Sequence, residues 1–204
     1  MPPERPPAIQ HDPSLVREDI AGPDAVTAPY PVYLQGWVTR GFGRGSKDLG
    51  CPTANLPDSS IEGVPLETGV HFGFARVLCS GGEAEHDAVF PMVMSIGWNP
   101  FYNNDTRTAE VHVLHDYPSD FYGKELRVVV LGYVRPEYNY ASMDALIKDI
   151  NHDKVVALNS VASDRPAYAR FQTDPFFSKP TDLEPLPAGH DPSRPREKPN
   201  QSSV

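Results

Sequence analysis

Residues 41–55 combine the chemical groups that a phosphate site needs. The segment reads Gly-Phe-Gly-Arg-Gly-Ser-Lys-Asp-Leu-Gly-Cys-Pro-Thr-Ala-Asn and contains four glycines. Glycine lets backbone N–H groups approach a phosphate closely, and Arg44 and Lys47 add positive charge. Thr53 and Asn55 add neutral oxygens, which Mg²⁺ accepts as ligands beside phosphate and water. The segment therefore predicts a site for a nucleotide phosphate and a cation.

This segment is not a Walker A loop, because that motif places Gly-x-x-x-x-Gly-Lys-Ser/Thr at the start of a helix. Pro52 and the turn-forming residues around it argue against a helix here. Two plainer interpretations stay open. Residues 41–45 suit a flexible hairpin or bulge, and residues 52–55 suit a turn held by side-chain hydrogen bonds of Thr and Asn.

Glu110 is a candidate general base on a predicted strand. Polar and apolar residues alternate around it in the order Thr108, Ala109, Glu110, Val111, His112, Val113. Because successive strand side chains point to opposite faces, Glu110 lies on the polar face. That face borders either a polar cleft, where Glu110 could take a proton, or solvent, which is the commoner environment of a strand carboxylate.

Two aromatic segments flank the last predicted strand. Asp120-Phe-Tyr-Gly123 predicts a turn whose rings could cover a planar ligand. Arg135-Pro-Glu-Tyr-Asn-Tyr140 places a cation, a carboxylate and two tyrosines before a predicted helix. A rigid strand-to-helix connection explains the second segment equally well.

Histidine and cysteine spacing gives no metal or redox motif. His112 and His115 are an odd number of residues apart, so they point to opposite strand faces and make poor joint ligands. The two cysteines, Cys51 and Cys79, form no Cys-x-x-Cys pair. Two cysteines are too few for a disulfide framework, which favours a reducing compartment.

Short β-branched and aromatic segments must position these residues. Five of them predict strands, at residues 32–40, 70–79, 88–96, 107–115 and 125–134. Turn signals separate the strands and no helix intervenes, which favours an antiparallel barrel or sandwich.

One helix is predicted after the strands, with Ser142 as its N-cap and Asp144 in its first turn. Apolar residues recur at helical spacing, namely Met143, Leu146, Ile147, Ile150, Ala157, Leu158 and Val161. We therefore expect one face of this helix to pack on the strands.

Proline marks the ends of the chain. Of 23 prolines among 204 residues, 8 lie in residues 1–31 and 7 in residues 175–204. Neither end carries enough apolar surface to offset its ordering entropy. We predict a weakly ordered arm at 1–28, a barrel domain at 29–170 and a Pro-rich tail at 171–204, with phenylalanines near 171–177 holding the start of the tail.

Charge and hydropathy limit the partners. The net charge of −9 disfavours nonspecific binding of nucleic acid. No apolar run approaches the roughly 20 residues that cross a membrane, and the N-terminus has neither an apolar signal core nor an Arg-rich transit pattern. We expect a cytoplasmic monomer without a membrane span or a nucleic-acid partner.

Taken in order, these segments resemble riboflavin kinase, the enzyme that phosphorylates riboflavin to FMN. The matching stretches are Gly41-Phe-Gly-Arg-Gly-Ser-Lys47, Leu49-Gly50, Pro52-Thr-Ala-Asn55, Ser95-Ile-Gly-Trp-Asn-Pro-Phe-Tyr102, Glu110-Val-His-Val113, Asp120-Phe-Tyr-Gly123, Gly132-Tyr-Val-Arg-Pro-Glu137 and the helix from Ser142 to Ala157. They cover about residues 32–160 at compatible spacings. Pro-Thr-Ala-Asn after a Gly/Lys loop is the most specific of them.

The resemblance implies a mainly β fold, a six-stranded antiparallel Greek-key barrel with one long C-terminal helix packed on it. It implies MgATP as phosphoryl donor, with Zn²⁺ or Mn²⁺ as alternative cations, and riboflavin as acceptor. It also implies the monofunctional eukaryotic type, which makes FMN but not FAD. No segment resembles an adenylyltransferase module, and no His-x-Gly-His occurs.

The resemblance also assigns roles by position. Thr53 and Asn55 correspond to the residues of the cation and the nucleotide phosphates. Gly41 and Lys47 correspond to the loop at the ATP site, with Arg44 beside them. Glu110 corresponds to the general base that takes the proton of the terminal ribityl hydroxyl. The implied flavin contacts are Glu110, Val113, His115, Arg135 and Tyr138.

Two other functions stay open at the level of sequence. A noncatalytic flavin-binding barrel, or a flavin-dependent oxidoreductase on a similar scaffold, would explain the aromatic segments but not the Gly/Lys/Thr/Asn combination. A structural or interaction module would use the acidic, Pro-rich ends as docking segments.

Overall fold

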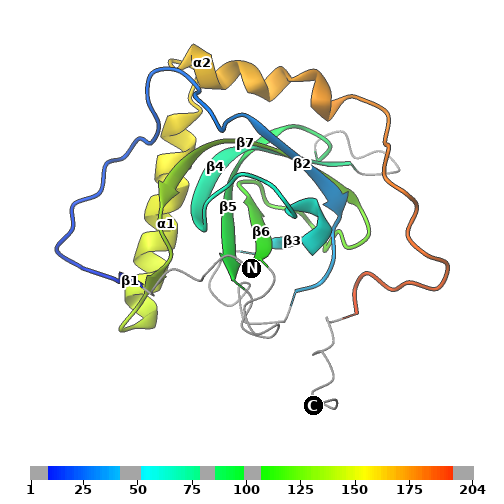
Figure 1. The fold of residues 1–204 in the computed structure, drawn as a ribbon, viewed down its shortest axis with the longest axis horizontal. Helices are drawn as coiled ribbons and strands as arrows, with labels where there is room; N and C mark the ends of the chain where they lie inside the picture. Colours follow the sequence, from blue (N-terminus) through cyan, green and yellow to red (C-terminus); the bar gives the residue numbers. More distant parts are fainter. Residues whose placement is uncertain (1–8, 42–51, 79–85, 99–106, 195–204) are drawn as a thin grey trace.

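Six strands form one antiparallel sheet that curls around an apolar interior (Figure 1). The computed structural model describes residues 9–41, 52–78, 86–98 and 107–194. The strands of this sheet are β2 (Val32–Trp37), β3 (Ala54–Leu56), β4 (Gly69–Leu78), β5 (Phe90–Trp98), β6 (Arg107–Val113) and β7 (Glu125–Arg135). Their order across the sheet is β2-β7-β4-β5-β6-β3.

The strand order is that of a Greek key. β4, β5 and β6 are consecutive neighbours, and β7 returns to pair with the other side of β4. The outer strands β2 and β3 approach each other just beyond β2, where the backbone N–H of Thr39 donates to the carbonyl of Asn55 at 3.0 Å. The predicted six-stranded Greek-key barrel is confirmed.

The strand β3 was missed by the sequence patterns. The five predicted strands correspond to β2, β4, β5, β6 and β7. The interpretation of residues 52–55 as a turn is wrong at Ala54 and Asn55, which pair with β6. A strand of three residues is too short to show a recognisable alternation.

The sheet is buried on both faces. The interior holds one apolar cluster, to which β7 contributes Leu126, Val128 and Val130. The outer face holds a second cluster, to which the same strand contributes Val129 and Leu131. Because successive side chains of β7 point to opposite faces of the sheet, this strand contributes to both apolar clusters.

Helical segments cover the outer face (Figure 1). They are α1 (Met143–Ser160), α2 (Pro166–Ala169), η3 (Arg170–Thr173) and η4 (Pro175–Phe177). A further turn, η1 (Asp58–Ser60), follows β3, and a small parallel sheet joins β1 (Ile9–Gln10) to β8 (Tyr138–Asn139). None of the helices in the described ranges is long and apolar enough to cross a membrane.

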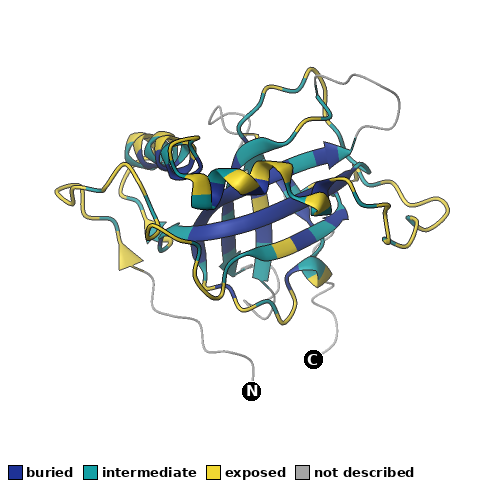
Figure 2. Cartoon of the chain, turned by 90° about the horizontal axis from the view of Figure 1, so that it is seen from above, coloured by how far each residue is buried: buried dark blue, intermediate teal, exposed yellow. Residues whose placement is uncertain are grey.

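The long helix α1 begins as predicted, because the Ser142 side chain accepts a hydrogen bond from the N–H of Ala145 at 3.2 Å. Its predicted apolar face is partly wrong. Met143 is 58% exposed and Leu158 is 48% exposed, and Figure 2 shows α1 with exposed residues along its outer side. The buried stripe instead includes two carboxylates, Asp149 and Asp153.

Both terminal segments lie against the barrel over their described residues. The N–H of Ala21 donates to Ser160 Oγ at 2.8 Å. At the other end, Trp37 Nε1 donates to the carbonyl of Glu184 at 2.8 Å, and the N–H of Arg40 donates to the carbonyl of Pro192 at 3.0 Å. The boundaries at 29 and 170 stay predictions, but specific hydrogen bonds cross both of them.

Replacing Leu131 by Ala tests the outer core. Leu131 is 1% exposed, so we expect Leu131→Ala to lower the free energy of unfolding by about 2–5 kcal/mol through lost burial and a new cavity. The matched control is Leu158→Ala on the exposed side of α1, expected to change it by no more than about 0.5 kcal/mol. Equilibrium urea unfolding measures both. Equal losses would contradict the assignment of the buried faces.

Candidate active site

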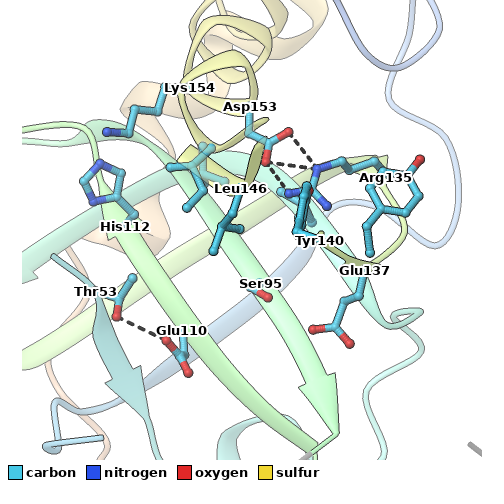
Figure 3. A pocket seen from close by; sticks show the side chains of 14 residues that line it. Thr53, Ser95, Glu110, His112, Arg135, Glu137, Tyr140, Leu146, Asp153 and Lys154 are labelled. Carbon is cyan, nitrogen blue, oxygen red and sulfur yellow. Dashed lines mark hydrogen bonds and ion pairs between the residues drawn. The ribbon is translucent and has the colours of Figure 1, made fainter. Parts of the chain in front are cut away.

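A cavity of about 290 Å³ lies between the outer face of the sheet and α1 (Figure 3). The residues that line it are Thr53, Val70, Val93, Ser95, Glu110, His112, Arg135, Glu137, Tyr138, Tyr140, Leu146, Ile150, Asp153 and Lys154. They come from both sheet and helix, so the sheet forms its floor and α1 one wall.

A row of paired residues crosses the floor of this cavity. The row begins beside the cavity at Asn55, which pairs with Glu110, and continues through Ser95 and Val70 to Arg135. Directly paired residues share one face of a sheet. Three strand spacings separate Glu110 from Arg135, which is about 14 Å. The cavity is therefore elongated, with a carboxylate toward one end and a guanidinium toward the other.

Oxygen donors gather at the Glu110 end. Thr53 Oγ1 lies 3.2 Å from Glu110 Oε2, and Asn55 is the cross-strand partner of Glu110. The Asn55 side chain lies against Gly41, where a Cβ atom would be 2.6 Å from Asn55 Nδ2. A side chain at position 41 would displace the amide, so the first glycine of the sequence motif is required for this arrangement.

This donor set suits a hard cation. Hydroxyl, amide and carboxylate oxygens are the ligands of Mg²⁺, which also keeps several waters. Within the described ranges, no group of three or more His, Cys, Asp or Glu side chains is placed to hold a metal ion. A cation at this end would therefore depend on the oxygens of Thr53 and Asn55 together with substrate and water, with the Glu110 carboxylate nearby.

A second cavity of about 340 Å³ opens beside the first. Its lining residues are Val38, Pro52, Thr53, Ala54, Val111, Val113, His115, Asp116, Tyr117, Pro118, Ser119, Asp120, Phe121 and Tyr122. The rings of Tyr117 and Phe121 lie 4.7 Å apart. Thr53 lines both cavities, so the two spaces adjoin at this residue.

Two cavities that share a hydroxyl beside a carboxylate suit a reaction between two bound substrates. The riboflavin kinase family model, named Flavokinase, matches residues 28–161. The chain belongs to the riboflavin kinase family. The resemblance found in the sequence motifs is thereby confirmed.

Individual proteins support the same family. A riboflavin kinase of Meyerozyma guilliermondii is 44% identical over 172 residues, covering 74% of this chain and 94% of the relative. A riboflavin kinase of Pyricularia oryzae is 47% identical over 167 residues, covering 76% of this chain and 82% of the relative. The crystal structure of riboflavin kinase from Trypanosoma brucei matches with a TM-score of 0.60 and 26% identity, covering 78% of this chain and 97% of that one. These similarities support a kinase that phosphorylates riboflavin to FMN.

The predicted site residues are divided between the two cavities. Glu110, Arg135 and Tyr138 line the first cavity. Val113 and His115, predicted as flavin contacts, line the second. His115 stacks on Phe90 at 3.9 Å, and its Nε2 lies 2.9 Å from Nδ1 of His86. The riboflavin kinase roles of Arg44 and Lys47 stay predictions, because both residues lie outside the described ranges.

Arg135 takes part in a buried ion pair. Its Nη2 donates to Asp153 Oδ2 at 2.8 Å, and its guanidinium lies 5.3 Å from the ring of Tyr138 and 5.9 Å from that of Tyr140. Burial alone would lower the pKa of Arg135, but the hydrogen bonds and charge of Asp153 raise it above its usual value. The guanidinium therefore holds the tyrosines at this end of the cavity.

Sequence reasoning missed the role of Asp153. Asp149 and Asp153 are four residues apart on α1 and both are buried. Both carboxylates lie on the stripe of the helix that otherwise packs against the sheet. This pattern could have predicted cationic partners for them, since buried charges require partners.

His112 was set aside as a metal ligand, yet it lines the first cavity. Its Nδ1 lies 2.8 Å from the carbonyl oxygen of Pro52. A carbonyl only accepts, so Nδ1 carries the proton and donates. Burial lowers the pKa of His112, which favours the neutral ring. His112 thus fixes the backbone immediately before Thr53.

Substitutions of His112 test this backbone contact. We expect His112→Ala to raise KM for ATP about two- to tenfold, because one hydrogen bond that positions Thr53 is lost. His112→Asn can place an amide N–H near the Nδ1 position and should retain most of the wild-type value, whereas His112→Gln should not. Steady-state FMN formation with varied ATP measures this. A KM for ATP that stays near the wild-type value in His112→Gln but rises in His112→Asn would contradict the assigned contact.

Proposed function

We propose that the protein transfers the γ-phosphoryl group of MgATP to the terminal hydroxyl of the ribityl chain of riboflavin, with Glu110 as general base. The observation that carries this proposal is the contact between Thr53 and Glu110 at the boundary of the two cavities. We expect the protein to act as a cytoplasmic monomer with riboflavin, FMN, ATP and ADP as its partners.

Riboflavin would occupy the first cavity, whose shape and chemistry support this assignment. It has a planar ring system and a flexible polyhydroxyl chain, and the cavity floor runs about 14 Å from Arg135 to Glu110. Tyr138, Tyr140 and the Arg135 guanidinium provide flat surfaces at one end. The ring would lie there, and the chain would extend past Ser95 toward Glu110.

ATP would occupy the second cavity, so Val113 and His115, which the resemblance implied as flavin contacts, would lie beside the nucleotide instead. The cavity's aromatic residues Tyr117, Phe121 and Tyr122 offer surfaces for a base, while Thr53 lies where the phosphates would meet the acceptor. Gly41 ends the described segment beside Asn55. Arg44 and Lys47 follow it in sequence, and we assign them to the phosphates by charge and by the family resemblance.

The chemistry requires one proton to leave the acceptor. Glu110 would accept the proton of the terminal hydroxyl while that oxygen bonds to the γ-phosphorus. The bond from the γ-phosphorus to the β–γ bridging oxygen breaks, and ADP departs with that oxygen. Thr53 and Asn55 would hold Mg²⁺, which supplies charge stabilisation for the phosphoryl group when bound.

Glu110→Gln tests the assigned base. Glutamine keeps the size of the side chain but cannot take the proton, so we expect kcat to fall about 10²–10⁴-fold with little change in riboflavin affinity. FMN formation measured by chromatography gives kcat, and flavin fluorescence titration gives the affinity.

The matched control is Glu137→Gln. Glu137 lines the same cavity but lies against Gly97 rather than Thr53, so its loss of kcat should be far smaller. Near-normal turnover by Glu110→Gln would eliminate Glu110 as the base. If FMN forms at the full rate in the presence of EDTA, the reaction does not require a divalent cation.

Ser95 lies midway along the floor and allows a test of the acceptor cavity. Ser95→Leu adds bulk between Glu110 and Val70, and we expect KM for riboflavin to rise at least about tenfold through steric exclusion. KM for ATP should stay near its original value. Ser95→Ala adds no bulk and controls for the lost hydroxyl. A rise in KM for ATP alone would reverse the assignment of the two cavities.

A further inference from the structure

The N-terminal arm reaches the helix that walls the first cavity. Arg17 forms an ion pair through Nη2 with Asp153 Oδ1, and its Nη1 lies 3.4 Å from Asp149 Oδ1. His11 Nε2 lies 3.5 Å from Asp149 Oδ2. Figure 1 shows the arm beside α1, with β1 near one end of the helix.

The same two carboxylates hold the residues of the cavity wall. Asp153 accepts hydrogen bonds from Arg135 Nε and Nη2 at 2.8–3.1 Å. Asp149 Oδ2 accepts a hydrogen bond from the Tyr140 hydroxyl at 2.7 Å. Asp153 therefore joins Arg17 to Arg135, and Asp149 joins both His11 and Arg17 to Tyr140.

Backbone pairing brings the arm to the tyrosines as well. β1 pairs in parallel with β8, so Ile9 lies opposite Tyr138. His11, which directly follows β1, donates its backbone N–H to the carbonyl of Asn139 at 3.0 Å, and its ring centroid lies 4.8 Å from that of Tyr140. The arm thus packs behind the side chains whose other surfaces line the cavity.

We propose that residues 9–21 of the N-terminal arm are a part of the acceptor site and that Arg17 is a positioning residue for riboflavin. Arg17 acts through Asp153 on Arg135 and does not line the cavity. The inference rests on the proposed assignment of riboflavin to this cavity. The arm precedes residue 28, where the match to the riboflavin kinase family model begins, so the family match does not cover this contribution.

Charge balance explains why Arg17 matters. The side chains of Asp149 and Asp153 are 10% and 3% exposed, and both face Arg17. Without Arg17, two neighbouring carboxylates would share Arg135 as their remaining guanidinium partner in this network. Buried carboxylates repel one another and attract any available cation. We expect Arg135 to shift toward Asp149 and to leave its place over the tyrosines.

The test is Arg17→Met in the full-length protein, which keeps much of the side-chain volume and removes the charge. We expect KM for riboflavin to rise about tenfold while kcat and KM for ATP change little, because uniform binding of one substrate is lost. Steady-state kinetics with each substrate varied gives both constants. Arg17→Lys retains the charge and should restore part of the riboflavin KM.

Arg76→Met is the matched control. Arg76 also forms a partly buried ion pair, 3.0 Å from Asp87, and donates to the carbonyl of Phe177. It lines neither cavity. Its substitution should lower the melting temperature without raising KM for riboflavin. A similar rise in both variants would overturn the proposal by showing a general effect of stability.

Other outcomes are also decisive. If wild-type protein makes FMN but Arg17→Met keeps its riboflavin KM, the role of the arm is wrong while the proposed function stands. If wild-type protein makes no FMN with MgATP, the proposed function itself fails. Should Arg17→Met not fold, His11→Ala takes its place, because it removes the ring behind Tyr140 and the contact with Asp149 but leaves both ion pairs of Arg17 intact. An unchanged riboflavin KM in His11→Ala would then reject the arm as a part of the site.

Discussion

The pairing of β3 with β6 determines where the oxygens of Asn55 and Glu110 lie. Ala54 and Leu56 are buried in the barrel interior, at 4% and 0% exposure, so Asn55 between them must point outward. There it lies opposite Glu110. A slip of one residue would bury the amide and expose two apolar side chains. The interior core thus fixes the register, and the register places amide and carboxylate side by side.

The outer face of the sheet serves both as a core and as a site. Toward the end of α1, Ala157 and Val161 belong to the apolar cluster with Phe72 and Leu131. Nearer the start of the helix, Leu146 and Ile150 line the cavity instead. Asp149 and Asp153 lie between, and their charges are compensated by arginines from two distant parts of the chain. Where the cavity separates α1 from the sheet, the ion pairs of Asp149 and Asp153 take the place of apolar packing.

Local periodicity predicted much of this arrangement. It identified five strands, the start of α1 and the polar face that carries Glu110. It could not identify β3, whose three residues are held by pairing with β6 rather than by their own pattern. It also misplaced Met143 and Leu158, because an apolar residue was assumed to be buried. The pair between Arg17 and Asp153 joins residues 136 positions apart, and no local pattern encodes such a contact.

Thr53 lines both cavities, and its backbone is held in place from two sides. Thr53 stands immediately before β3, and its backbone is fixed on one side by the pairing of Ala54 with Val111 and on the other by the bond from His112 to Pro52. Its hydroxyl can therefore keep one position while ligands enter from either cavity. Phosphoryl transfer depends chiefly on such positioning and on charge stabilisation. A fixed hydroxyl at the junction, with a carboxylate 3.2 Å away, favours direct transfer between two bound substrates over transfer through the protein.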